Sequence, residues 1–209
     1  PKALAESVGL PSGNPRDPEA VIRAVKPPVL VGTSGEPGTF KESAIREMAK
    51  HVPRPVVLPM SNPTANSEAT PVDVLNWTEG RALVATGSPF EAVTYAGRRI
   101  VIGQANNAFV FPGVGLGAIL SEAREVTDSM FTVAADRLAM VPSESDLATG
   151  SLFPSVRDLR PVTAVIAEAV IKEARDCGVG KKIPDEEIPG LVAGAMWKPE
   201  YPDLVPAKG

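Results

Sequence analysis

Cysteine, histidine and aromatic residues are scarce in this sequence. Its 209 residues include one cysteine (Cys177), one histidine (His51) and 5% aromatic residues. A single cysteine excludes an internal disulfide framework and is typical of a reducing compartment, so we expect a cytoplasmic protein. No Asp/Glu cluster has metal-ligand spacing, and His51 and Cys177 both lie near expected helix ends, where a structural role is favoured over catalysis. The sequence therefore predicts no metal site and no catalytic group of its own.

Long runs of one kind of residue are also missing. There is no basic tract and the net charge is −4, so we expect neither nucleic acid nor an anionic membrane as a partner. The longest uncharged stretch, 100–121, is broken by polar residues, a proline and glycines, which makes it a poor membrane span. The N-terminus has neither the apolar core of a signal peptide nor a start methionine. We therefore expect a processed product or a piece of a longer protein.

Four short apolar runs are present, and each ends in small, polar, turn-forming residues. The runs are 29–31, 56–58, 82–85 and 100–102. Such runs are typical of strands that are buried on both faces of a parallel sheet. Because the carboxyl ends of parallel strands meet at one edge, where ligands bind, the polar residues that follow these runs are candidates for ligand contacts.

Helical patterns separate the first three runs. Segment 39–50 begins with Thr39 as a candidate N-cap, and Glu42 completes a capping box. Segment 70–77 has Pro71 at the first helical position. Strands and helices that alternate in this way predict βαβ units, and hence half of an α/β nucleotide-type sheet. Three more helices are predicted at 109–124, 128–140 and 162–174.

Asparagines follow two of the apolar runs. Asn62 precedes Pro63, which restricts its backbone to extended geometry, and its amide can donate to a carboxylate or a ribose hydroxyl without adding charge. The alternative is a simple Asx turn that ends the strand. Asn106 and Asn107 follow the last run, where an ordinary loop is the alternative to a ligand contact.

Two glycine patterns bear on nucleotide binding. Residues 113–118 match the dinucleotide fingerprint G-x-G-x-x-A, but Pro112 stands at its head and no second strand follows. We therefore interpret these glycines as sites of close helix packing. The glycines at 32, 35 and 38 have the wrong spacing for that fingerprint, although their backbone amides precede a helix and could face an anionic group.

Five segments of the chain occur together in one known family. They read GTSGEPGTF (32–40), RPVVLPMSNPT (54–64), EGRALVATGSPF (79–90), GQANNAFVFPGVGLGA (103–118) and FPSVRDLRPVTAVIA (153–167). In order and spacing they resemble the later part of the NAD(P)-binding domain of the malic enzyme family, over residues 20–177. The resemblance implies an α/β fold, the second half of a doubly wound (Rossmann-type) parallel sheet with C-terminal helices. It implies a partial NAD(P)-binding domain at 1–177 and a C-terminal extension at 178–209, which we expect to cover another surface or contact another subunit.

The resemblance also implies a reaction. Malic enzymes transfer a hydride from L-malate to NAD or NADP and release CO2 and pyruvate, with Mg or Mn holding the substrate, and a homo-oligomer is expected. By motif, the implied substrate-binding residues are Asn62, Asn106 and Asn107. The implied cofactor-binding residues are Thr33, Ser34, Asn62, Gly87, Ser88 and Asn107.

The chain departs from the family pattern in two ways. Ala105 stands where the family motif has glycine. The family's catalytic tyrosine and lysine, its acidic metal ligands and its first phosphate loop all lie upstream, so we expect this piece to be inactive alone and its choice between NAD and NADP to be set elsewhere. One alternative stays open, a non-catalytic binding or assembly module. Another NAD-dependent dehydrogenase is a third hypothesis, against which the five segments in register argue.

Overall fold

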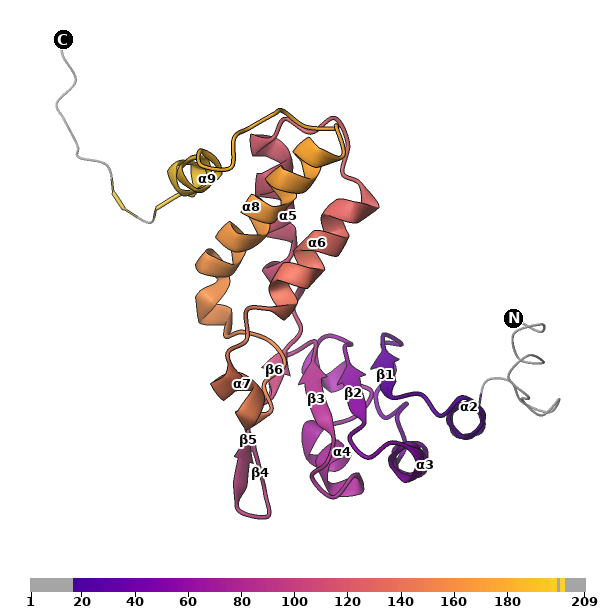
Figure 1. Cartoon of the computed structure of the whole chain (residues 1–209). Coiled ribbons are helices and arrows are strands. Elements are labelled where there is room, and N and C mark those ends of the chain that lie inside the picture. Colours follow the sequence, from indigo (N-terminus) through magenta and orange to yellow (C-terminus); the bar gives the residue numbers. More distant parts are fainter. Residues whose placement is uncertain (1–16, 199, 202–209) are drawn as a thin grey trace, which may run out of the picture. The chain divides into compact units, whose positions relative to one another are not determined.

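The chain folds into two compact units, shown in the computed structural model of Figure 1. The structure describes residues 17–198 and 200–201. Among the described residues, the first unit comprises 17–109 and Leu138–Leu159, and the second comprises Val110–Arg137, 160–198 and 200–201. No helix within the described residues is long and apolar enough to span a membrane.

A parallel sheet of four strands forms the centre of the first unit. The strands, in the order β1-β2-β3-β6, are β1 (Val29–Gly32), β2 (Val56–Pro59), β3 (Leu83–Thr86) and β6 (Gly103–Gln104). Helix α3 (Glu42–His51) connects β1 to β2, and α4 (Pro71–Trp77) connects β2 to β3. Because all three strand pairs are parallel, every carboxyl end lies at the same edge of the sheet. The prediction of an α/β fold with a parallel sheet and C-terminal helices is confirmed.

Burial differs between the strands. Val57 of β2 and Val84 of β3 are buried against Ile45 and Met48 of α3 and Leu75 of α4 in one core. Strand β1 is different, because Val29 and Val31 are 46% and 56% exposed. The prediction that each run is buried on both faces is therefore wrong for β1, which is an outer strand of the four.

The fourth apolar run does not form the fourth parallel strand. Ile100 ends an antiparallel hairpin of β4 (Val93–Tyr95) and β5 (Arg98–Ile100). Ala96 and Gly97 turn this hairpin with φ of 46° and 77°, the left-handed pair that two-residue hairpins favour. The Val101 N–H then donates to the Thr149 carbonyl at 2.9 Å, and strand pairing in the parallel sheet resumes only at Gly103.

The two predicted helix starts have different outcomes. Helix α4 is confirmed, since Pro71 is its first residue and the Thr70 hydroxyl accepts from the Asp73 N–H at 3.2 Å. The capping box at Thr39 is wrong. Helix α3 begins at Glu42, and the side chain of its N-cap residue, Lys41, makes no capping bond. The Thr39 hydroxyl lies before the cap and donates to the Glu36 carbonyl at 2.7 Å.

Helices make up the second unit. They are α5 (Phe111–Leu120), most of α6 (Asp128–Ala139), α8 (Leu159–Asp176) and α9 (Ile188–Ala195). Helix α9 was not predicted; it lies within 178–209 and packs Ile188 and Val192 against α8. The domain boundary at residue 177 stays a prediction. Short elements complete the described part of the chain: α2 (Pro18–Val25), α7 (Glu144–Thr149) and the 3-10 turns η1 (Thr64–Asn66), η2 (Asn107–Phe109) and η3 (Val156–Asp158).

Close packing of α5 on α8 depends on two glycines of the rejected dinucleotide match. A Cβ on Gly113 would lie 2.5 Å from Cγ2 of Ile166, and one on Gly117 would lie 2.7 Å from Cβ of Val170. A Cβ on Gly115, between them, would meet nothing within 4 Å. The interpretation of these glycines as helix-packing residues is confirmed for Gly113 and Gly117 but not for Gly115.

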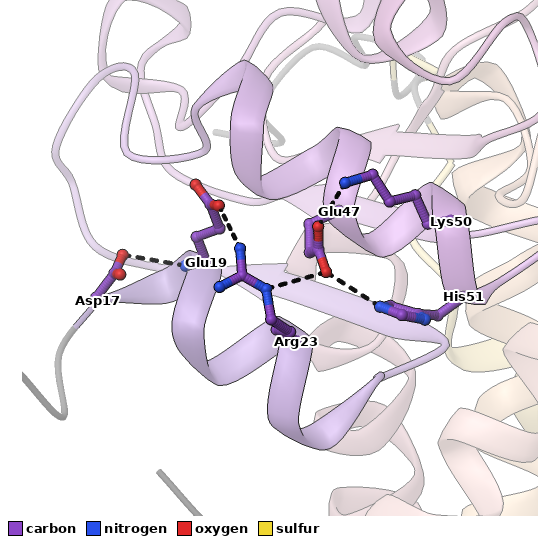
Figure 2. Close-up of polar contacts among 6 residues, drawn as sticks. All are labelled: Asp17, Glu19, Arg23, Glu47, Lys50 and His51. Atoms are coloured by element: carbon purple, nitrogen blue, oxygen red, sulfur yellow. Dashed lines mark hydrogen bonds and ion pairs between the residues drawn. The ribbon is translucent and has the colours of Figure 1, made fainter. Parts of the chain in front are cut away.

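A buried carboxylate joins α2 to α3 in the first unit. Figure 2 shows Glu47 between Lys50, His51 and Arg23. Lys50 Nζ donates to Glu47 at 2.8 Å, His51 Nε2 lies 3.2 Å away, and Arg23 Nε donates at 3.2 Å from α2. Led by Lys50 and His51, these partners lower the pKa of Glu47 from 4.5 to about 2. His51 is the last residue of α3, as expected for a residue at a helix end.

We expect Gly113→Ala to destabilise the chain by about 1–3 kcal/mol, because its methyl group overlaps Ile166 in a packed helix contact. Gly115→Ala is the matched control in the same helix and should stabilise by about 0.5–1 kcal/mol, because alanine restricts the unfolded chain. Urea unfolding of the three chains measures both changes. Equal effects of the two substitutions would contradict the packing role.

We expect the Glu47 cluster to stabilise the chain fully above pH 4.5 and to lose this contribution as the pH falls toward about 2, because the folded-state pKa is depressed. Thermal melts between pH 6 and pH ~2 measure this loss. Glu47→Gln should have a lower melting temperature at pH 6 and a smaller further decrease on acidification. Parallel pH curves for the two chains would show that Glu47 contributes nothing to the acid transition.

Candidate functional site

Polar side chains gather where the four parallel strands end. The loop after β1 supplies Ser34, the loop after β2 supplies Ser61, Asn62 and Glu68, and the loop after β3 supplies Ser88. Parallel strands present these loops at one edge, which is the usual place for a ligand in an open α/β sheet.

Glu68 lies at the centre of this edge. Its side chain is fully buried, with 0% exposure. Oε1 accepts from the Ser34 N–H at 2.8 Å, from the Ser34 hydroxyl at 2.9 Å and from the Ser61 hydroxyl. Oε2 accepts from the Ser61 N–H at 3.3 Å, and the Gly35 N–H donates to the Ser61 hydroxyl oxygen at 2.9 Å. One carboxylate thus bonds the loops that follow β1 and β2.

These hydrogen bonds keep Glu68 ionised. Burial raises the pKa of a carboxyl group, but the bonds from Ser61 and Ser34 outweigh that effect, and the pKa of Glu68 lies below its ordinary value. Across residues 17–198 and 200–201, Glu68 takes part in no ion pair. The negative charge is therefore balanced by loop donors, and among the amides of the Gly32–Gly38 region it is the Ser34 N–H that donates to it, while the Gly35 N–H donates to the Ser61 hydroxyl and the Gly38 N–H to the Ser67 carbonyl.

Asn62, Gly87 and Ser88 meet beside this cluster. The buried Ser88 hydroxyl donates to Oδ1 of Asn62, whose side chain is exposed. This bond uses the Asn62 side-chain oxygen, and within the described residues the Asn62 amide N–H groups make no hydrogen bond. A Cβ on Gly87 would lie 2.0 Å from the Met60 carbonyl oxygen, and Gln104 Nε2 donates to the Gly87 carbonyl at 3.2 Å.

The contact between Asn62 and Ser88 differs from an Asx turn. In an Asx turn the side-chain oxygen accepts from the backbone two residues on. Asn106 does this, since its Oδ1 accepts from the Ala108 N–H at 2.9 Å, which agrees with the loop alternative for that residue. Oδ1 of Asn62 instead bonds the loop that follows the neighbouring strand. Its proposed contact with a ligand stays a prediction.

The remaining predicted residues stand apart from these contacts. Thr33 follows β1 and is exposed, and Asn107 begins η2 and is also exposed. Within the described part of the chain, no hydrogen bond joins Thr33 or Asn107 to Asn62, Ser34 or Ser88. The structure thus unites Asn62 with Gly87 and Ser88, and Ser34 with Glu68.

Sequence reasoning missed Glu68. An acidic residue near a helix start is ordinarily exposed, so the pattern gave no reason to place it in the core. One signal was present: Glu68 is the only charged residue between 55 and 72. The described residues contain no group of three His, Cys, Asp or Glu side chains that could hold a metal ion.

The parallel sheet, its two crossover helices and its polar carboxyl edge define part of a dinucleotide-binding type of α/β domain. The chain belongs to the malic enzyme family, because the family model described as malic enzyme, NAD binding domain, matches residues 9–175.

Relatives of known sequence agree with this assignment. The NAD-dependent malic enzyme of Aeromonas salmonicida is 47% identical over 181 residues, which cover 87% of this chain and 32% of the relative. The NAD-dependent malic enzyme of Salmonella arizonae is 47% identical over 183 residues, covering 88% of this chain and 32% of the relative. The chain thus spans about a third of the length of the curated relatives that it matches.

Solved structures agree as well. The malic enzyme of Pyrococcus horikoshii OT3 superposes with a TM-score of 0.63 at 28% identity, covering 85% of this chain and 36% of that one. The malic enzyme of Entamoeba histolytica superposes with a TM-score of 0.68 at 24% identity, covering 88% of this chain and 34% of that one, and this likeness concerns the fold alone.

Proposed function

We propose that this chain is the NAD-binding part of an enzyme that oxidises L-malate and releases pyruvate and CO2. The relatives that are 47% identical are named NAD-dependent malic enzymes, which supports NAD as the dinucleotide rather than NADP. The observation that supports a site at the sheet edge is the bond between Ser88 and Asn62, which leaves the Asn62 amide donors for an anionic substrate.

The proposed roles follow from the position of each residue at this edge. Asn62 donates to a malate carboxylate and so orients C2 for hydride transfer, while Asn106 and Asn107 line the same site. Thr33, Ser34, Gly87 and Ser88 approach the cofactor, and the open backbone at Gly35, where a Cβ would meet nothing within 4 Å, leaves room for it. When bound, NAD accepts the hydride.

The metal is proposed to bind elsewhere in a longer parent protein. The described residues do not fit Mg or Mn, because they contain no group of acidic ligands. The acid–base pair that the family uses is likewise proposed to lie outside this chain. We further propose a homo-oligomeric, cytoplasmic parent, the latter because a single cysteine suits a reducing compartment.

We expect the 209-residue chain alone to show no malate-dependent reduction of NAD or NADP in the presence of Mn, because the metal and proton-transfer groups are assigned to the parent. Absorbance of the reduced nicotinamide measures this directly. A preparation of the full-length parent is the positive control. Turnover by the chain alone, in material free of host enzyme, would contradict the division of roles.

We expect Asn62→Ala in the full-length parent to lower kcat/KM for malate about ten- to a hundredfold, because a hydrogen bond to a charged group contributes about 1.5–3 kcal/mol. Asn62→Asp should be more harmful, since its carboxylate repels the substrate and cannot donate. Asn76→Ala, an exposed asparagine of α4, is the matched control. Steady-state kinetics and thermal melts measure both effects. Normal kinetics with a lowered melting temperature in Asn62→Ala would leave Asn62 with a structural role only.

A further inference from the structure

We propose that Glu68 is the positioning residue of this site: its buried carboxylate holds the loop after β1 and the loop after β2 in the arrangement that catalysis needs. This inference rests on the proposed function, in which Ser34 approaches the cofactor and Asn62 binds the substrate. Glu68 itself is buried and touches neither ligand in this account.

The Glu68 carboxylate is surrounded by hydrogen-bond donors. Four donors converge on the two oxygens: the N–H and hydroxyl groups of Ser34 and of Ser61. A buried charge without a cation is tolerated only when hydrogen bonds replace its hydration. The charge therefore requires both loops to be in place, and each loop in turn depends on the charge for its hydrogen bonds.

Packing and backbone bonds fix Glu68 itself. A Cβ on Gly32 would lie 2.7 Å from both Cγ and Cδ of Glu68, so the side chain lies directly against the end of β1. The Phe40 N–H donates to the Glu68 carbonyl at 3.0 Å, and the Gly38 N–H donates to the Ser67 carbonyl at 3.3 Å. The segment that bears Glu68 is thus attached to the loop after β1 by its backbone as well as by its side chain.

Ser61 links Glu68 to Asn62, the proposed substrate residue. Ser61 bonds Glu68 through both its N–H and its hydroxyl, and Asn62 follows it directly in the chain. On its other side Asn62 is bonded by Ser88. Asn62 is therefore located by contacts from two loops, and a displacement of about 1 Å at a reacting centre can cost about a hundredfold in rate.

The test uses the full-length parent and two substitutions at Glu68. Glu68→Gln keeps the shape but removes the charge and turns an N–H2 group toward donors that need an acceptor. Glu68→Asp keeps the charge on a side chain that is one methylene shorter. Glu42→Gln, an exposed residue of α3 paired with Arg46, is the matched control.

We expect Glu68→Gln to lower kcat about ten- to a hundredfold at temperatures where the protein stays fully folded, and Glu68→Asp to restore part of the loss. A purely structural role would lower the melting temperature and leave kcat unchanged. Hydrogen exchange should show segments 33–41 and 60–63 losing protection together in Glu68→Gln. Glu42→Gln should match the wild type in kcat and in the exchange of segment 60–63, with only a small loss of stability from its exposed pair with Arg46.

Ser61→Ala provides the second route if Glu68→Gln does not fold, because it removes one hydroxyl donor and leaves the carboxylate in place. It should lower kcat in the same direction, and the double variant should be no slower than the slower single variant, since both act through one contact. Normal kcat in Glu68→Gln, or in Ser61→Ala where the former does not fold, would overturn the role of Glu68. An inactive wild-type parent would instead refute the proposed function, and this role with it.

Discussion

A carboxylate buried without a cation is the constraint around which this sheet edge is built. Glu68 is fully buried and satisfied by donors from Ser34 and Ser61. Removing the charge from water is costly, so the donors must be present whenever the protein is folded. Two loops that are distant in sequence consequently adopt one joint arrangement. Thr33 and Asn62 are exposed residues on those loops, and their positions depend on the buried carboxylate of Glu68.

The same edge shows how a site can be rigid although it lies on loops. Loops are ordinarily the more mobile parts of a domain, and binding residues gain precision when hydrogen bonds and packing hold them. Here Ser88 holds the Asn62 amide from the third strand's loop, and Gln104 holds the Gly87 carbonyl from the fourth strand. Charge on Glu68 and neutral bonds on Asn62 thus combine in one network. Under the proposed function, the exposed Asn62 side chain is the group that recognises a carboxylate.

Particular residues show what the sequence could and could not predict. The runs at 29–31, 56–58 and 82–85 formed strands, because short apolar runs bounded by turn residues suit a parallel sheet. The prediction of a parallel strand at 100–102 was wrong, because a left-handed turn at Ala96 and Gly97 places Ile100 in an antiparallel hairpin. Thr39 bonded the Glu36 carbonyl and did not cap a helix. The position of Asn62 at a strand end could be predicted from the sequence. The buried position of Glu68 could not, because hydrogen bonds between loops produce no periodic pattern in the sequence.

Gly87 sets a limit on how this edge can be redesigned. Any side chain there would overlap the main-chain oxygen of Met60, which cannot swing aside as a flexible side chain would. Position 87 therefore tolerates only glycine, in evolution as in protein engineering. New specificity must come from exchanging neighbours such as Ser88, and such exchanges act on the Asn62 amide at the same time. Under the proposed function, an exchange at Ser88 would therefore change ligand selectivity and substrate orientation together.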